Sequence, residues 1–428
     1  MQRLDFSDAR HLVSRTALGQ EWDTVNSIKG RNRKDAVNII LRNAPNQTPP
    51  LPSMTSWNNI MRMSNHSSKG KRDARMQMGR ESVRLKQWWI NHLLTTKAPV
   101  QERMTLFWHN HFTSSFEKVQ QPKIMYLQNQ LLRENAMGNF AVMLRKIARD
   151  PAMLIYLDGS LNKKGKPNEN FARELLELFT LGRGNYSEQD IKAAAIAFTG
   201  WGADREKGVF VYDAKEHEGK RVRFLNQWVQ NGDQVLDVIL KTPRTAEYVA
   251  EKFWREFISY HTPPAHVIRR WGNVFRSSNY QISVLLKEVL NSDEFWSQRY
   301  RAGLIKSPID LVIGTLRALP YGRPEVSKLV RISQLLGQDL FDPPSVKGWP
   351  GGKQWIDTRT LLVRSSLLNR LTRTTKTSAH TEQRLPNTDG QTVVEWLLPR
   401  KPALDLPTVP GKLRLVKALL VDPAYQLK

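Results

Sequence analysis

The sequence predicts a mainly α protein: a large multi-helical body with long irregular loops and at most a small β hairpin. Apolar residues recur at helical spacing in most segments, as Ala36, Ile39 and Ile40 do within residues 33–43. The stretches between them are rich in Pro and Gly, which interrupt regular structure. A hydrophobic content of 40% over 428 residues, with 13 Trp, allows a sizeable core.

Apolar faces and capping signals predict the elements in order. In the first helix, Asp8 lies near the start and Gly19 follows the end. The helical segments expected in the first half are residues 8–18, 33–43, 73–95, 101–112 and 123–150. Those expected in the second half are residues 243–259, 264–278, 281–299, 306–319 and 359–373, with two weaker helices after them.

Three stretches are expected to be irregular or extended. The linker at residues 44–54 contains prolines, which lack the N–H that a helix or a strand ladder needs. Residues 204–227 alternate weakly and contain β-forming residues, so they are the candidate hairpin. Residues 340–357 hold too many Pro and Gly residues for a regular element.

The domain organisation follows from a change in composition near residue 373. Residues 1–373 are expected to form the helical body. Residues 374–390 are polar, so residues 374–428 are expected to form a flexible connector and a C-terminal helical appendage. No internal repeat divides the chain further.

Composition excludes several kinds of site. The chain has no cysteine, which excludes a disulfide, a thiolate nucleophile and a Cys-ligated zinc or iron–sulfur centre. No apolar run is long enough for a membrane span, and the N-terminus lacks the apolar stretch of a signal peptide. We therefore expect a soluble protein that is cytoplasmic or is exported with a partner, and composition does not choose between these.

The strongest compositional signal is the net charge of +25. It favours a polyanionic partner: nucleic acid, an anionic polysaccharide, a lipid surface or an acidic protein. Residues 62–86 concentrate the charge, with eight basic residues and only Asp73 and Glu81 as acids. The alternative is a solvated basic helix, because charge alone guarantees only non-specific attraction.

The most informative segment is residues 167–201, PNENFARELLELFTLGRGNYSEQDIKAAAIAFTGW. It predicts two capped helices joined by a Gly turn. With DARHLVSRTALG, MTLFWHNHF and LGQDLFDPPSVKGWPGGKQWI, it closely resembles the domain of unknown function 1800 family over almost the whole chain. A further motif is degraded, because Glu218 and Asn226 stand where the family usually has Asp and Gly. The resemblance implies a bacterial protein, often exported, whose partner is a phosphatase- or sulfatase-like protein encoded alongside.

The two histidines of FWHNHF are candidate metal ligands. In a continuous helix, His109 and His111 point to opposite faces, since residues two apart differ by roughly 200°. They could bind one ion only if the backbone extends or the helix ends there. Otherwise one histidine packs among Phe107, Trp108 and Phe112 and the other is exposed.

The best catalytic candidates lie in NENFARELLELF. Asn170, Glu174 and Glu177 stand at i, i+4 and i+7, so they share one helix stripe. Two carboxylates beside an amide could hold a divalent metal through oxygen ligands or act as an acid–base pair. Arg173 is four residues from Glu169 and from Glu177, so structural salt bridges are the alternative.

A third set would depend on convergence in space. Asp158 ends an apolar run and could join Asn168 and the carboxylate helix around one pocket. His217 would then act as a catalytic group from an irregular loop, and Lys220 would neutralise an anionic substrate. The simpler interpretation makes Asp158 part of a helix C-terminal turn.

The loop PPSVKGWPGG is not a phosphate loop, because it lacks the Gly–Lys–Ser/Thr arrangement that opens a helix. Trp349 and Trp355 could form a stacking platform for sugar or base rings. The alternative is a wedge that packs its Trp into the core. The sequence also lacks a nucleotide-binding glycine fingerprint, a nucleophile elbow and an HExxH motif.

Two functions remain open. The favoured one is a basic accessory or binding protein that acts with the phosphatase- or sulfatase-like neighbour or with a polyanion. The other is a metal- or carboxylate-dependent hydrolase or transferase acting on an anionic substrate. Nucleic-acid binding is a weaker third choice, since no helix-turn-helix spacing or zinc module supports it.

Overall fold

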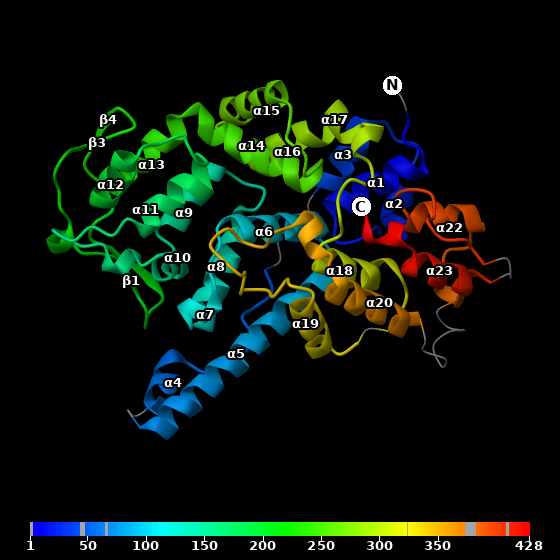
Figure 1. Cartoon of the computed structure of the whole chain (residues 1–428), viewed down its shortest axis with the longest axis horizontal. Helices are drawn as coiled ribbons and strands as arrows, with labels where there is room; N and C mark the ends of the chain where they lie inside the picture. The colour runs from blue at the N-terminus through cyan, green and yellow to red at the C-terminus, as the bar shows by residue number, and fades with distance from the viewer. Residues whose placement is uncertain (1–2, 43–47, 65–66, 323, 373–381, 408–410) are drawn as a thin grey trace.

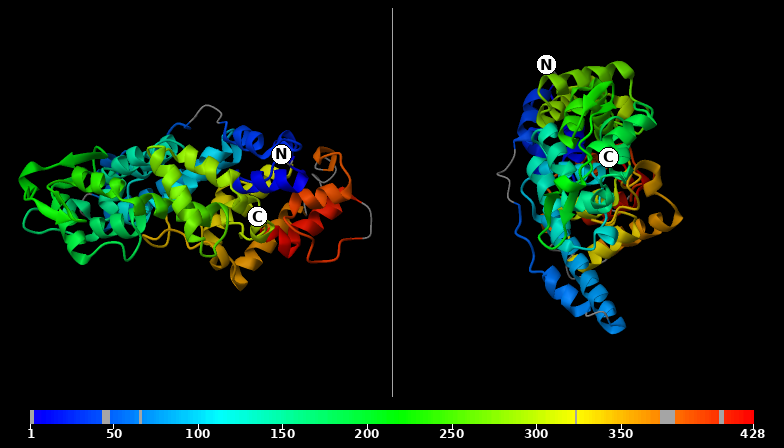
Figure 2. Two further views of the ribbon diagram at one scale, coloured as in Figure 1. Left: turned by 90° about the horizontal axis from the view of Figure 1, so that it is seen from above. Right: turned by 90° about the vertical axis from the view of Figure 1, so that its left-hand side faces the viewer.

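The computed structural model describes residues 3–42, 48–64, 67–322, 324–372, 382–407 and 411–428. Over these ranges the protein is mainly α, with two small antiparallel hairpins, which confirms the predicted fold class. The body is elongated (Figures 1 and 2), with the N-terminal helices and the C-terminal segment at one end and the hairpins at the other. No described helix has the length and apolar character needed to cross a membrane.

The described part of residues 1–161 forms helices. They are α1 (Phe6–Thr16), α2 (Trp22–Ile28), α3 (Arg33–Leu41), α4 (Trp57–Ser64), α5 (Ser68–Thr95), α6 (Pro99–His111), α7 (Phe116–Val119), α8 (Pro122–Asn135), α9 (Phe140–Ala148), α10 (Pro151–Tyr156) and η1 (Gly159–Leu161). The pattern predicted over residues 123–150 is divided into α8 and α9. The reason is local, because the side chain of Asn139 accepts a hydrogen bond from the N–H of Val142 and so begins a new helix.

The signature segment and the hairpins follow. They are α11 (Asn170–Glu174), the π-helix η2 (Leu175–Thr180), α12 (Glu188–Ala197), β1 (Trp201–Asp204), β2 (Val209–Tyr212), η3 (Ala214–Glu216), β3 (Val222–Phe224) and β4 (Gln227–Val229). As predicted, two helices enclose a Gly turn, and Ser187 with Asp190 forms the capping box of α12. The N-cap residue of α11, Glu169, makes no side-chain capping bond in the described chain. One hairpin was expected over residues 204–227, whereas two, β1–β2 and β3–β4, lie within residues 201–229.

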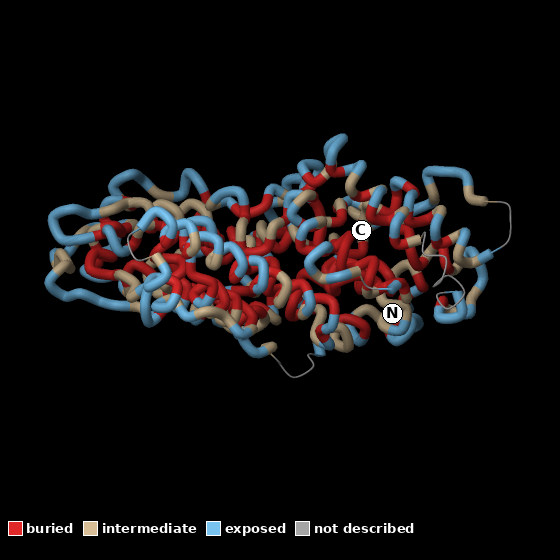
Figure 3. Tube along the Cα trace, turned by 90° about the horizontal axis from the view of Figure 1, so that it is seen from below, coloured by how far each residue is buried: buried red, intermediate tan, exposed pale blue. Residues whose placement is uncertain are grey.

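The second half completes the body. Its elements are α13 (Gly232–Lys241), α14 (Pro243–Phe257), α15 (Ala265–Ser277), α16 (Ile282–Asn291), α17 (Asp293–Trp296), η4 (Gln298–Tyr300), α18 (Pro308–Ala318), α19 (Val326–Leu335), η5 (Gly352–Trp355), α20 (Thr358–Thr372), α22 (Gly390–Leu397), α23 (Lys412–Val421) and η6 (Pro423–Gln426). Buried residues extend along the whole interior of the long axis (Figure 3), so one hydrophobic core links both ends.

The C-terminal segment packs back onto the N-terminal helices. The boundary predicted near residue 373 falls in residues 373–381, which lie outside the described residues. Beyond them, the indole of Trp396 on α22 donates a hydrogen bond to the carbonyl of Gln20 (2.7 Å) and packs against Trp22. The described part of the predicted appendage therefore shares the core of the body, and a separate unit at residues 374–428 stays a prediction.

Candidate functional site

His109 lies in the aromatic core rather than at a surface. α6 continues to His111, so the two histidines diverge as a continuous helix requires. The His109 ring packs edge-on against Trp89 (5.0 Å between ring centroids) and against Phe341 (5.4 Å). Neither ring nitrogen has a hydrogen-bond partner among the described residues. Burial, aided by the charge of Arg133, lowers the pKa of His109 to about 3, so the ring is neutral.

His111 occupies a different environment on the other side of α6. Its Nε2 donates a hydrogen bond to the carbonyl of Phe179 (3.0 Å), and its Nδ1 is buried without a partner. Burial, aided by Lys252, lowers the pKa of His111 to about 3. The structure does not bring His109 and His111 to one ligand set. In the ranges that the structure describes, no three His, Asp or Glu side chains are placed to hold a metal ion.

The signature helix contains a π-helical turn. The α11 helix passes directly into η2, where the N–H of Leu181 donates to the carbonyl of Leu176 (2.9 Å), five residues back. The wider turn leaves two successive carbonyls free for partners on other helices. Tyr248 Oη donates to the carbonyl of Leu178 (3.1 Å), and His111 binds the next carbonyl. The signature helix is thereby tied to α6 and α14.

The two glutamates of the signature have different surroundings. Glu177 accepts a hydrogen bond from Tyr186 (3.1 Å) and pairs with Arg183 (3.3 Å). Glu174 is half-buried and forms no ion pair within the described residues. Burial, and next the charge of Glu177, raise the pKa of Glu174, while Arg173 and Lys347 oppose the shift. Glu174 is therefore the better acid–base candidate of the two.

Arg173 forms ion pairs that join two helices, and it does not pair with Glu177 in the described structure. Its guanidinium binds Glu169 (3.0 Å), as the four-residue spacing predicted, and also Glu188 on α12 (2.9 Å). The two helices of the signature are therefore joined by a mostly solvent-facing ion-pair network.

Asp158, Asn168 and Asn170 come together, as the sequence suggested. The amide of Asn170 donates to Asp158 Oδ2 (3.2 Å), and Lys118 pairs with the same oxygen (2.8 Å). The side chain of Asn168 accepts from the backbone N–H of Asn170 (2.9 Å) and so holds the start of α11. Asp158 has a left-handed backbone conformation with φ 58°, consistent with a turn after α10.

His217 and Lys220 belong to a separate loop. His217 Nδ1 lies 2.9 Å from the carbonyl oxygen of Thr199, and Lys220 pairs with Glu218 (3.6 Å). Across the described chain, no hydrogen bond or ion pair joins either residue to Asp158 or Glu174. The loop that carries them bonds the segment before Asn168, where the N–H of Gly165 donates to Glu218 (3.1 Å). A site shared with these carboxylates stays a prediction.

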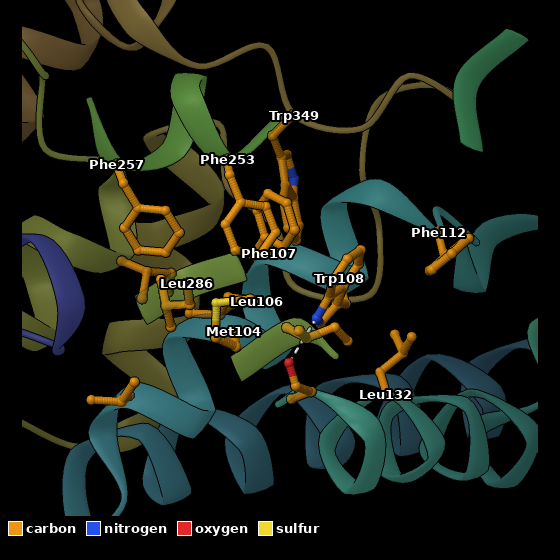
Figure 4. Close-up of a cluster of buried hydrophobic side chains, with 14 of the residues drawn as sticks. Met104, Leu106, Phe107, Trp108, Phe112, Leu132, Phe253, Phe257, Leu286 and Trp349 are labelled. Carbon is orange, nitrogen blue, oxygen red and sulfur yellow. Dashed lines mark hydrogen bonds between the residues drawn. The ribbon is translucent and has the colours of Figure 1, made fainter. Parts of the chain in front are cut away.

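A cleft of 530 Å³ opens at the centre of the body, between α6, α14, the start of α18 and the loop at residues 344–355. We call it the central cleft. Segments 104–112 and 336–356, both singled out by the sequence, meet in its wall. Figure 4 shows Phe107, Phe253 and Trp349 in one region of the aromatic core, where the rings of Phe107 and Phe253 are 5.1 Å apart. Phe107 and Trp349 also line the cleft.

The loop at residues 344–355 is held against α6 by a close backbone contact. The N–H of Trp349 donates to the side-chain oxygen of Asn110 (2.6 Å), and Gly348 has φ 80°. A Cβ at Gly348 would overlap with Asn110, so only glycine fits. Trp349 and Trp355 are each 5% exposed and line the cleft. They pack as a wedge, and whether they stack on a ligand stays a prediction.

The floor of the cleft carries a buried charge cluster. Asp310 pairs with Arg103 and with Lys428 (2.7 Å), and Arg103 also approaches Glu256 (3.6 Å). Burial alone would raise the pKa of Asp310, but Arg103 and Lys428 hold it well below its usual range. Both carboxylates of the cleft are therefore already engaged by cations.

The wall of the cleft adds three cations, Lys252, Arg255 and Lys347. Within the described ranges, none of them is within ion-pair distance of a carboxylate. Lys252 lies 4.8 Å from the centre of the Tyr248 ring. Burial, then the neighbouring Arg255, lower the pKa of Lys252 to about 8. With five cations and two carboxylates, the central cleft is a positively charged cavity with aromatic walls.

Sequence analysis missed Arg103, Lys252, Asp310 and Lys428, because they are far apart in the chain and form no local motif. One signal was available. Arg103, Phe107 and Asn110 stand at i, i+4 and i+7 on α6, so they share one face, and all three line the cleft.

A family model described as "Protein of unknown function (DUF1800)" matches residues 11–427. All the residues that line the cleft lie within this match except Lys428. No curated protein and no solved structure gives a significant match.

Proposed function

Since the chain belongs to the DUF1800 family, whose function is unknown, we propose its function from its own geometry: it is a basic helical binding protein that holds an anionic group in the central cleft. The observation that carries this proposal is the set of wall cations, Lys252, Arg255 and Lys347, which have no carboxylate partner in the described protein. Lys252 is half-buried, and a half-buried cation without a counter-charge is costly unless a ligand neutralises it. Arg255 and Lys347 are exposed and add positive potential at the mouth of the cleft.

The shape and lining of the cleft indicate the chemistry of the ligand. Its volume of 530 Å³ is in the range of small-molecule sites. Cations at the wall favour carboxylate, phosphate or sulfate groups. Tyr260, which is 39% exposed, offers its ring to an apolar or cyclic body, and Trp349 and Trp355 line the wall beside it. A small ring-bearing acid or one anionic unit of a polymer fits both features.

The field of the surrounding protein supports an anionic ligand. Behind the cleft, Arg15 is fully buried and donates to the carbonyls of Phe257 (3.0 Å) and Ile258 (3.2 Å) rather than to a carboxylate. Such buried charge raises the positive potential of a cavity and attracts anions over a distance. The net charge of +25 acts in the same direction.

Calorimetric titration tests the proposal with two probes, inorganic phosphate and phenyl phosphate. Both should bind, and phenyl phosphate more tightly, because its ring meets the aromatic wall. Lys252→Ala should weaken binding by about 10- to 100-fold, which corresponds to one charge-assisted hydrogen bond.

Lys353→Ala is the matched control, since Lys353 is exposed and does not line the cleft. It should bind both probes as the wild type does. The absence of binding, or an equal loss in both variants, would show that the cleft is not the site.

A second candidate function is an acid–base reaction on the bound anion. The observation that favours it is the position of Glu174, a half-buried carboxyl with a raised pKa whose charge interacts with Lys347 at the cleft wall. If a divalent metal takes part, elemental analysis of untagged, chelator-free protein should find about one equivalent, lost in Glu174→Gln. Metal-free protein would eliminate the metal-dependent form.

A further inference from the structure

A helical hairpin projects from the body and is independent of the central cleft. It consists of α4 and the first part of α5, residues 57–64 and 67–84, and we call it the helical arm. Figure 1 shows the arm extending away from the other helices, and the end-on view in Figure 2 shows the same projection. Ile60 on α4 and Gly70 and Ala74 on α5 are buried within the described structure, where the two helices pack together.

The base of the arm is fixed by one buried carboxylate. Glu81 is 0% exposed and accepts hydrogen bonds from Thr55 Oγ1 (2.9 Å) and Gln77 (2.7 Å). It also pairs with Arg84 (3.1 Å). These bonds join the segment that precedes α4 to α5. The arm is therefore held in one conformation by its own hydrogen bonds.

The surface of the arm is almost purely cationic. Its exposed basic residues are Arg62, Lys69, Lys71, Arg72, Arg75 and Arg80. In the described chain, none of these six forms an ion pair. The acids of the segment are Glu81, which is buried, and Asp73, which is partly buried. One acid from another segment, Glu206, accepts a hydrogen bond from Asn58 at the start of α4 (2.8 Å), and the six cations themselves are unpaired within the described residues.

The arm also exposes three long apolar side chains. Met61 is 48% exposed, Met63 42% and Met76 50%. A single exposed apolar residue is ordinary. Here three flexible methionines are exposed on the same hairpin as the six unpaired cations, so they form a group. Helices that lie in a membrane interface have the same composition. Their cations bind anionic headgroups, and their apolar side chains enter the region between the headgroups and the acyl chains.

We propose that the helical arm binds an anionic lipid surface. Its cations would contact the headgroups, and the methionines on the face turned to the lipid would enter the interface. Met61 and Met63 are two residues apart on α4, so one of them, not both, would do so together with Met76. Nucleic acid explains the observations less well, because it would leave the methionines unused, and the tryptophan of α4, Trp57, is partly buried rather than presented for stacking on bases. The projection of the arm lets its tip reach a flat surface while the body stays clear of it.

Co-sedimentation of the full chain with vesicles tests the proposal. The protein should sediment with vesicles of phosphatidylcholine and phosphatidylglycerol, not with phosphatidylcholine alone, and binding should fall as salt rises. Arg72→Gln with Arg75→Gln should weaken binding by about 25-fold, at roughly fivefold for each cation near the surface. Lys192→Gln with Lys241→Gln is the matched control, because both lysines are exposed on other helices.

A second double variant separates lipid insertion from simple charge attraction. Met61→Ser with Met63→Ser keeps every charge and should still weaken binding several-fold. Circular dichroism should show unchanged helix content in all variants. Unchanged binding by the methionine variant would overturn the proposal and favour a charge-only partner such as nucleic acid. Equal loss in the lysine control would assign binding to the net charge of the whole protein.

Discussion

The buried imidazole of His109 leads to a quantitative prediction for His109→Phe. The pKa of His109 is about 3 in the folded protein, against 6.5 for an unperturbed histidine. Between these values the unfolded chain binds a proton that the folded protein does not, so the wild type loses stability as pH falls through this window. From about pH 7.5 to about pH 5 the loss is about 2 kcal/mol for this one histidine. His109→Phe should lack that part of the acid sensitivity.

Urea unfolding gives the free energy of unfolding of wild type and variant at both pH values. The effect is the difference between the two proteins in the stability they lose from the higher pH to the lower. The cost of packing a larger ring is the same at both pH values and cancels. The contribution of Asp150, whose pKa burial raises to about 7 and which acts with the opposite sign, also cancels because wild type and variant share it. If wild type and His109→Phe lost the same stability on acidification, the conclusion that His109 is neutral and without a hydrogen-bond partner would be refuted.

A matched variant separates burial from hydrogen bonding. His111 has the same lowered pKa, but its Nε2 also donates to the carbonyl of Phe179. His111→Phe should therefore show the same reduced acid sensitivity and, in addition, lose about 1 kcal/mol or more at both pH values.

Two further substitutions probe contacts of α6, one at the cleft and one in the core. Gly348→Ala places a Cβ against Asn110 at φ 80° and should lower stability by about 1–3 kcal/mol, measured by thermal unfolding, with weaker phosphate binding as Trp349 moves. Glu102→Gln removes the buried charge that Arg133 (3.0 Å) binds, and should cost about 3–5 kcal/mol in urea unfolding, because an unpaired guanidinium remains in the core. A stability change below about 1 kcal/mol in either variant would contradict these contacts.

Much of the fold could be predicted because its signals are local. The Gly turn and the capping box at Ser187 and Asp190 depend on residues within one or two turns of each other. The π-helical turn at residues 175–180 was not predicted, since the same apolar pattern suits an α-helix. Tyr248 and His111 bind the carbonyls that this turn leaves free. Both residues are distant in the chain, so the local sequence does not reveal these bonds.

The candidate site was predictable only in part. Asp158, Asn168 and Asn170 are near one another in the chain and do meet in space. His217 and Lys220 form no hydrogen bond or ion pair with them in the described chain, and their loop is held by Thr199 and by the N–H of Gly165, which donates to Glu218. Loop placement depends on packing that no local pattern encodes.

The sequence by itself determined the mainly α class, the family and the concentration of positive charge, because periodicity, motifs and composition are properties of the chain. Only the tertiary structure decided that both histidines are neutral core residues and that Arg103, Lys252 and Lys428 gather in one cleft. The physical reason is that burial and long-range pairing set the charge state and partners of a side chain, and both arise only when segments hundreds of residues apart pack together.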